Sequence, residues 1–162
     1  MSSAGKNLSD FSHMQVPSAK PYTFGIVVAE WNTNITGPLL EGAIDGLKKN
    51  GAELDNIDVY PVPGSFELTA GALLLAESGK YDAVITLGCV IQGETRHFDV
   101  ICAAVAHGVS EVSIKTGIPV IFGVLTTDNL EQAQDRAGGK HGNKGEEAAV
   151  TAIKMAEMKS LF

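Results

Sequence analysis

The chain has 162 residues, of which 44% are hydrophobic and 19% are charged, and its formal net charge is −7 at pH 7. This length supports one domain with a sizeable core, and the hydrophobic content excludes a disordered chain. The acidic balance argues against a nucleic-acid partner, although local basic groups can still bind a small anion. No apolar run reaches the roughly 20 residues of a membrane span, and the first residues lack a signal-peptide pattern. We therefore expect a cytoplasmic protein with no membrane partner.

Segments typical of strands and of helices alternate along the chain. Short β-branched and apolar runs predict strands at residues 23–29, 57–62, 81–87 and 120–125. Apolar residues at helical spacing predict one helix that ends near residue 49 and further helices at 65–77, 97–116, 129–136 and 146–160. Residues 137–145 form a break rich in glycine and lysine.

This alternation is typical of βαβ units, in which a parallel sheet is covered on both faces. We therefore expect an α/β three-layer sandwich of the flavodoxin-like type, with a central four-stranded parallel sheet and helices on both faces. Residues 1–21 are rich in Ser, Lys, Gly and Pro and predict a flexible N-terminal arm, and residues 22–162 predict a single domain. In such folds ligands bind at the carboxyl ends of the strands.

The loop after the third expected strand has the most informative composition. Gly88 and Gly93 allow backbone N–H groups to approach an anion, and Thr95 adds a hydroxyl group. His97 follows where a helix is expected to begin, and a helix start disfavours a protonated imidazole. A neutral histidine beside an anion pocket is a good proton-transfer group near pH 7. The alternative is an ordinary surface histidine at a helix start.

The remaining histidines and the cysteines predict no metal site. His13 lies in the expected arm, His107 in the middle of a helix and His141 in the glycine-rich break, so none has metal-ligand spacing. Cys89 and Cys102 are the two cysteines, and we expect both to be reduced, buried and small.

Four further residues have both a structural and a ligand-binding interpretation. Trp31, the only tryptophan, is either a core or edge aromatic or a flat platform for a planar ring. Ser65 and Glu67 open a helix, where they either cap it or bind the hydroxyl or amide groups of a ligand. Arg136 ends a helix and either meets its dipole or clamps a phosphate group.

Seven motifs, in order and at matching spacing over residues 23–160, resemble the 6,7-dimethyl-8-ribityllumazine synthase family. Among them, Gly88-Cys89-Val90-Ile91 with Gly93, Thr95 and His97 carries the proposed chemistry. The other six are Trp31-Asn32, Leu40-Glu41-Gly42-Ala43, Pro63-Gly64-Ser65-Phe66-Glu67-Leu68, Phe122-Gly123-Val124-Leu125-Thr126-Thr127, Glu131-Gln132-Ala133 with Arg136-Ala137-Gly138, and Asn143-Lys144-Gly145.

The resemblance implies a transferase of riboflavin biosynthesis. The expected reaction condenses 5-amino-6-(D-ribitylamino)uracil with 3,4-dihydroxy-2-butanone 4-phosphate to give 6,7-dimethyl-8-ribityllumazine, phosphate and water. The family needs no metal and no organic cofactor. Schiff-base formation, phosphate loss and ring closure are proton-transfer steps that a neutral histidine can assist.

The resemblance also assigns roles to individual residues. His97 takes the acid–base role, Trp31 stacks on the pyrimidine, and Glu67 binds the ribityl chain. Phe122 and Arg136 come from an adjacent subunit, where Arg136 holds phosphate and Lys144 assists. The full substrate-binding set is Trp31, Ser65, Phe66, Glu67, Cys89, Val90, Ile91, Phe122 and Lys144, and the phosphate-binding set is Glu94, Thr95 and Arg136.

Two positions depart from the family pattern. Relatives often have Arg or Lys in place of Gln92 and a small residue in place of Glu94. A carboxylate aimed at phosphate would repel it. We therefore expect Glu94 to use its backbone N–H group and to turn its side chain outward.

Assembly is implied by the same resemblance. The family forms pentamers with active sites between subunits, and some members build a sixty-subunit shell, with riboflavin synthase as a candidate partner. The short break at residues 138–145 favours a shell over a free pentamer. Two competing functions stay open: a binding module that stores riboflavin on Trp31, and a shell-forming scaffold with a decayed site. The presence of Thr95, His97 and Arg136 argues against decay.

Overall fold

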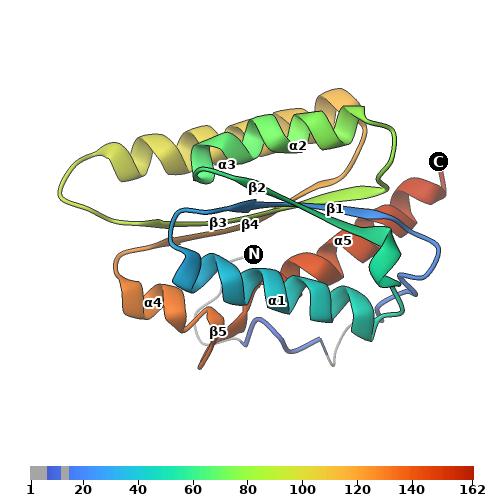
Figure 1. Ribbon diagram of the computed structural model, residues 1–162, viewed down its shortest axis with the longest axis horizontal. Coiled ribbons are helices and arrows are strands. Elements are labelled where there is room, and N and C mark those ends of the chain that lie inside the picture. Colours follow the sequence, from blue (N-terminus) through green and yellow to red (C-terminus); the bar gives the residue numbers. More distant parts are fainter. Residues whose placement is uncertain (1–6, 12–14) are drawn as a thin grey trace.

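A four-stranded parallel sheet forms the centre of the computed structural model, which describes residues 7–11 and 15–162 (Figure 1). His13 lies outside the described residues. In spatial order the strands are β2 (Ile57–Val62), β1 (Phe24–Ala29), β3 (Ala83–Ile91) and β4 (Val120–Thr127). Every neighbouring pair of strands in this sheet is parallel, as the alternation of strands and helices predicts.

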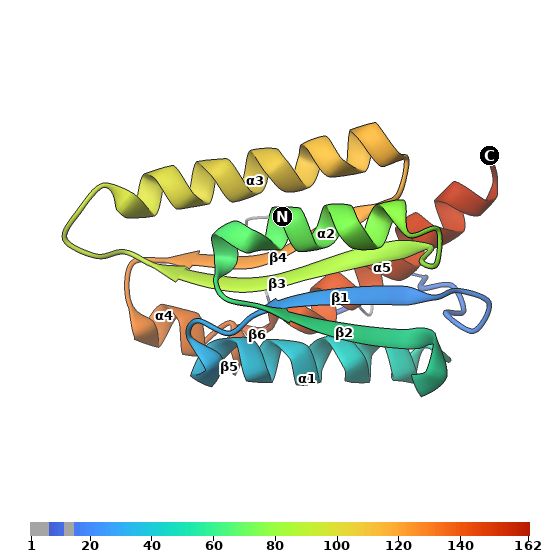
Figure 2. The same cartoon turned by 45° about the horizontal axis from the view of Figure 1, so that its top comes forward.

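Helices cover both faces of the sheet, which confirms the three-layer α/β fold (Figures 1 and 2). One face carries α1 (Thr33–Lys49), α4 (Leu130–Gln134) and α5 (Lys144–Ser160), and the other carries α2 (Leu68–Glu77) and α3 (His97–Thr116). Each face has its own buried apolar cluster: Leu39 and Ile153 are fully buried on the first, and Leu68 and Val105 are buried on the second. A parallel sheet buried on both faces explains why its strands are almost continuously apolar.

The strands that lead to the site are longer than predicted. The expected strand 81–87 runs to Ile91, and the expected strand 120–125 runs to Thr127. The added residues pair with one another as far as Ile91 and Thr127, and the N–H group of Gln92 donates to the carbonyl oxygen of Thr127 at 2.8 Å. Gly88 was therefore a misleading boundary signal, because this glycine lies within the strand rather than at its end.

Other boundaries also differ. The expected helix 65–77 begins with a 3₁₀ turn, η2 (Ser65–Glu67), and another 3₁₀ turn, η1 (Leu54–Asn56), precedes β2. The expected break 137–145 contains an antiparallel ribbon of β5 (Ala137–Gly139) and β6 (Gly142–Asn143). The last helix starts two residues earlier than predicted because the Asn143 side chain accepts a hydrogen bond from the N–H group of Gly145 at 2.8 Å.

Part of the expected arm contacts the ribbon. The N–H group of Leu8 donates to the carbonyl oxygen of His141 at 2.7 Å, and the hydroxyl of Ser9 accepts a hydrogen bond from the N–H group of Asn143 at 3.0 Å. Ala19 is fully buried in the core on the α1 side. The flexibility of residues 1–21 as a whole stays a prediction.

Among the described residues, every helix is too short or too polar to cross a membrane.

Candidate active site

The site lies where strand β3 extends beyond the end of its neighbour β1. The pairing of β1 with β3 ends at Val28 and Leu87, whereas β3 continues to Ile91 along β4. Beyond Leu87, one edge of β3 therefore has no neighbouring strand. Backbone groups of successive residues point to opposite edges of a strand. Because Gln92 bonds to β4, the N–H and C=O groups of Ile91 point to the open edge.

The chain after β1 turns away from β3 and toward β2. The N–H group of Glu30 donates to the carbonyl oxygen of Val62 at 2.8 Å, and that of Trp31 donates to the carbonyl oxygen of Pro63 at 3.1 Å. The next residue, Asn32, has a left-handed conformation (φ 62°, ψ 47°) and begins α1. This turn opens the space between the end of β3 and the loop that carries Trp31.

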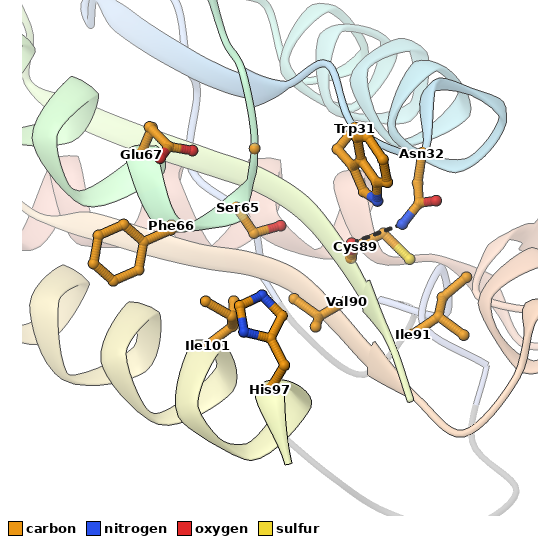
Figure 3. Close-up of a pocket in the computed structure, with 11 residues that line it drawn as sticks. Trp31, Asn32, Ser65, Phe66, Glu67, Cys89, Val90, Ile91, His97 and Ile101 are labelled. Carbon is orange, nitrogen blue, oxygen red and sulfur yellow. Dashed lines mark hydrogen bonds between the residues drawn. The ribbon is translucent and has the colours of Figure 1, made fainter. Parts of the chain in front are cut away.

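A cavity of about 600 Å³ occupies this space (Figure 3). His97 and Trp31 lie on opposite sides of it, with the end of β3 between them (Figure 3). The lining residues come from four segments of the chain: Trp31, Asn32, Gly64, Ser65, Phe66, Glu67, Cys89, Val90, Ile91, His97 and Ile101. Eight of the residues that the sequence points to are thus brought together at the carboxyl end of the sheet.

The η2 turn presents Ser65 and Glu67 to the cavity. Ser65 packs closely on the strand, and a Cβ atom at Gly88 would lie 2.7 Å from the Ser65 hydroxyl, so a larger residue there would force Ser65 to move. The side chain of Ser65 does not cap the helix, so its interpretation as an N-cap is not observed. Within residues 7–11 and 15–162 neither the Ser65 hydroxyl nor the Glu67 carboxylate has a hydrogen-bond partner, which leaves both available to a ligand.

His97 is the first residue of α3, and it is exposed. Its backbone N–H group donates to the Thr95 hydroxyl at 3.3 Å, which ties the loop to the start of the helix. Ile101 follows one turn later and lies beside the imidazole ring (Figure 3). Glu94 and Thr95 are exposed in the preceding loop and do not line the cavity.

Three predicted site residues lie away from this cavity. Phe122 is half-buried against the core on the α2 and α3 side. Arg136 donates a hydrogen bond from Nη1 to the carbonyl oxygen of Gln132 at 3.0 Å. Lys144 pairs with Glu147 at 2.7 Å, and both side chains are only 14% exposed. The chain does not bring these residues to its own pocket.

Two large aromatic side chains beside the cavity are open to solvent. Trp31 is 71% exposed and Phe66 is 56% exposed. The interpretation of Trp31 as a core aromatic is therefore wrong. Exposed aromatic rings at the rim of a cavity are available to stack on a ligand or to be covered by another surface.

Sequence reasoning did not assign site roles to Asn32, Gly64 and Ile101. Ile101 lies four residues after His97 on the same helix, so helical spacing could have identified it. Asn32 adjoins Trp31, but its contact with the end of β3 depends on the tertiary fold, and no local sequence signal predicts it.

In the part of the chain that the structure describes, no cluster of three or more His, Cys, Asp or Glu side chains is suited to hold a metal ion.

Cys89 contributes a buried thiol to the cavity wall. Its side chain is 1% exposed, and burial raises the pKa of the thiol from 9.0 to about 11. At pH 8 the folded protein therefore holds about 100-fold less thiolate at this position than the unfolded chain does.

We predict that iodoacetamide at pH 8 modifies Cys89 at least about 100-fold more slowly in the folded protein than in urea, because alkylation requires the thiolate. Peptide mass spectrometry measures the modification of each cysteine, and Cys102 serves as the internal comparison. Equal rates in the folded and unfolded states would show that the Cys89 thiol is not buried and that its pKa is not raised.

Comparisons with known proteins show the family of the chain. The family model of 6,7-dimethyl-8-ribityllumazine synthase matches residues 21–160. A 6,7-dimethyl-8-ribityllumazine synthase from Cytophaga hutchinsonii is 63% identical over 96% of this chain and 97% of its own length. Enzymes of the same name from Phocaeicola vulgatus and Porphyromonas gingivalis are 56% and 54% identical, over 98% and 99% of this chain and 95% and 100% of their own lengths. The chain therefore belongs to the 6,7-dimethyl-8-ribityllumazine synthase family, which confirms the resemblance that its sequence motifs carry.

Proposed function

We propose that this cavity is where the chain carries out the reaction of its family. In that reaction 5-amino-6-(D-ribitylamino)uracil condenses with 3,4-dihydroxy-2-butanone 4-phosphate, and 6,7-dimethyl-8-ribityllumazine, phosphate and water leave. The observation that carries the proposal is that one cavity joins an open strand edge, a solvent-exposed indole, an unpartnered carboxylate and a histidine. The strand edge and the indole suit a planar imide, the carboxylate suits a polyhydroxyl chain, and the histidine suits a series of proton transfers.

The uracil ring binds between the end of β3 and Trp31. The open N–H and C=O groups of Ile91 offer one donor and one acceptor side by side. An imide edge of uracil presents the complementary acceptor and donor, so a strand edge recognises it as it would another strand. The indole of Trp31 stacks on the ring face, an interaction worth roughly 0.5–1.5 kcal/mol beyond the area buried. Cys89 and Val90 contribute through backbone and wall contacts.

The ribityl chain lies toward η2. Ser65 and Glu67 both line the cavity, and their hydroxyl and carboxylate have no hydrogen-bond partner among the described residues. Phe66 covers the rim. A carboxylate accepts strong hydrogen bonds from hydroxyl groups. This assignment explains why the polar groups of η2 are left unpaired at a cavity wall.

His97 transfers protons, and the loop before it receives the phosphate group. The loop is exposed, its threonine hydroxyl lies next to the first N–H groups of α3, and a helix start favours an anion. Glu94 contributes its backbone N–H group and keeps its carboxylate turned outward. Thr95 supplies a hydroxyl, and His97, two residues later, serves both the Schiff base and the departing phosphate.

A second copy of the chain completes the site. We propose that Phe122, Arg136 and Lys144 of one subunit serve the cavity of its neighbour, because they lie away from their own cavity while that cavity has exposed aromatic rings at its rim. The assembly that contains these shared sites is a cytoplasmic pentamer. Twelve pentamers are favoured to form a sixty-subunit shell, with riboflavin synthase as a partner. Sedimentation velocity should give the shell, which is twelve times heavier than one pentamer; a monomer would contradict a shared site.

Storage of riboflavin on the exposed indole of Trp31 is the second candidate function. A yellow, flavin-bound preparation without turnover would favour it over the enzyme.

Replacing His97 with alanine should lower kcat about 100-fold without abolishing turnover, because a general acid–base contributes 10²–10⁴-fold and proximity supplies part of the rate. The measurement follows lumazine absorbance and the release of one phosphate per turnover. His107→Ala is the matched control, since that histidine lies within α3 and does not line the cavity. An unchanged rate in His97→Ala would remove this residue from the mechanism.

Replacing Arg136 with alanine should raise KM for the phosphate substrate about 10- to 100-fold and change KM for the uracil substrate far less, since charge-assisted hydrogen bonds to phosphate are lost. Equal weakening of both substrates would contradict its role. Mixed assemblies of His97→Ala and Arg136→Ala chains then test whether the site is shared. Random mixing should restore activity at about one quarter of the interfaces. No recovery would place both residues in one subunit's site.

A further inference from the structure

Asn32 joins two parts of the cavity wall through a side-chain hydrogen bond. Its side-chain Nδ2 donates a hydrogen bond to the carbonyl oxygen of Cys89 at 3.0 Å (Figure 3). Asn32 follows Trp31 in the loop after β1, whereas Cys89 lies in the part of β3 beyond its pairing with β1. The bond therefore links the loop that carries the indole to the strand edge on the far side of the open gap.

The amide of Asn32 replaces a backbone donor that the fold has removed. If β1 continued in register, the N–H group of residue 31 would donate to the carbonyl oxygen of Cys89. Instead, that N–H group donates to Pro63 on the opposite side. Without Asn32, the carbonyl oxygen of Cys89 would be a second open acceptor beside the N–H and C=O groups of Ile91. With Asn32 in place, that carbonyl oxygen is occupied, and the N–H and C=O groups of Ile91 form the open donor and acceptor pair.

The usual role of an asparagine at a helix start does not explain this residue. Asn32 occupies the N-cap position of α1, yet its side chain makes no capping hydrogen bond. Its backbone carbonyl already accepts hydrogen bonds from the N–H groups of Ile35 and Thr36, at 2.8 and 3.0 Å. Among the described residues it is also the only non-glycine residue with a positive φ. Asparagine tolerates this conformation and supplies the side-chain donor, a combination that glycine and aspartate do not offer.

We propose that Asn32 is a positioning residue for the uracil substrate, which holds the Trp31 loop at a fixed distance from β3 and occupies the Cys89 carbonyl so that the ring pairs with Ile91. The inference deepens the proposed function and rests on it. The residue acts through Cys89 and Trp31 rather than on the reacting atoms. Its contribution therefore falls on the uracil ring and leaves the phosphate substrate unaffected.

Three variants test this inference. Asn32→Gly keeps the left-handed conformation and removes the amide, and Asn32→Asp keeps the shape but places a carboxylate against a carbonyl oxygen. Asn34→Asp is the matched control, because Asn34 is exposed in the first turn of α1 and does not line the cavity. Since Trp31 is the only tryptophan, its fluorescence reports on this loop alone, both without ligand and during titration with 5-amino-6-(D-ribitylamino)uracil.

In both Asn32 variants the uracil Kd and KM should rise about tenfold, the value of one hydrogen bond that orders a site, while KM for the phosphate substrate changes less than about twofold. The ligand-free fluorescence anisotropy of Trp31 should fall in both, and the control should match the unaltered protein. If Asn32→Gly does not fold, Asn32→Asp provides the same comparison.

Two results would overturn the inference. Uracil affinity within about twofold of the unaltered protein in the Asn32 variants would show that the bond positions nothing. A loss of uracil affinity with unchanged ligand-free anisotropy would show that Asn32 contacts the ligand directly instead. Failure of the proposed function is distinguishable, because it would appear as absent lumazine formation in the unaltered protein, whereas the ligand-free anisotropy would still report on the Asn32 bond.

Discussion

The cavity exists because β1 is shorter than β3 at the carboxyl edge of the sheet. Strand β3 stays paired with β4 as far as Ile91, while its other edge loses its partner strand after Leu87. Where a strand has a neighbour on both sides, its backbone N–H and C=O groups are hydrogen-bonded within the sheet. Where one neighbour is missing, these groups must bind water, another chain or a ligand. Here the open length is short and lies at the base of a cavity, which suits a small planar imide rather than another strand.

The functional groups around this edge come from elements on both faces of the sheet. The loop after β1 supplies a flat indole, η2 supplies a hydroxyl and a carboxylate, and the start of α3 supplies the imidazole. The strands and helices next to these groups are anchored in the two buried apolar clusters. The exposed indole of Trp31 and ring of Phe66 leave the outer side of the cavity open, which is consistent with a second subunit that covers it.

Much of this arrangement could be predicted from the sequence, because the apolar runs of a doubly covered parallel sheet are distinct and glycine marks several turns. Eight of the eleven residues that line the cavity could be predicted from strand ends and from the family motifs. The predicted strand end at Leu87 is wrong because the glycine that follows, Gly88, is normally a boundary signal, whereas here it makes room for Ser65 inside the strand. The ribbon at residues 137–143 and the bond from Asn32 to Cys89 depend on contacts between segments distant in the sequence, and no local pattern encodes them.

We propose that the open backbone edge of Ile91, and not a side chain, recognises the pyrimidine. A crystal structure of the protein with 5-amino-6-(D-ribitylamino)uracil tests it most directly. We expect two hydrogen bonds between the heterocycle and the N–H and C=O groups of Ile91, with the ring stacked on Trp31. A ring bound elsewhere, or held only by side chains while Ile91 keeps water on both groups, would contradict the account.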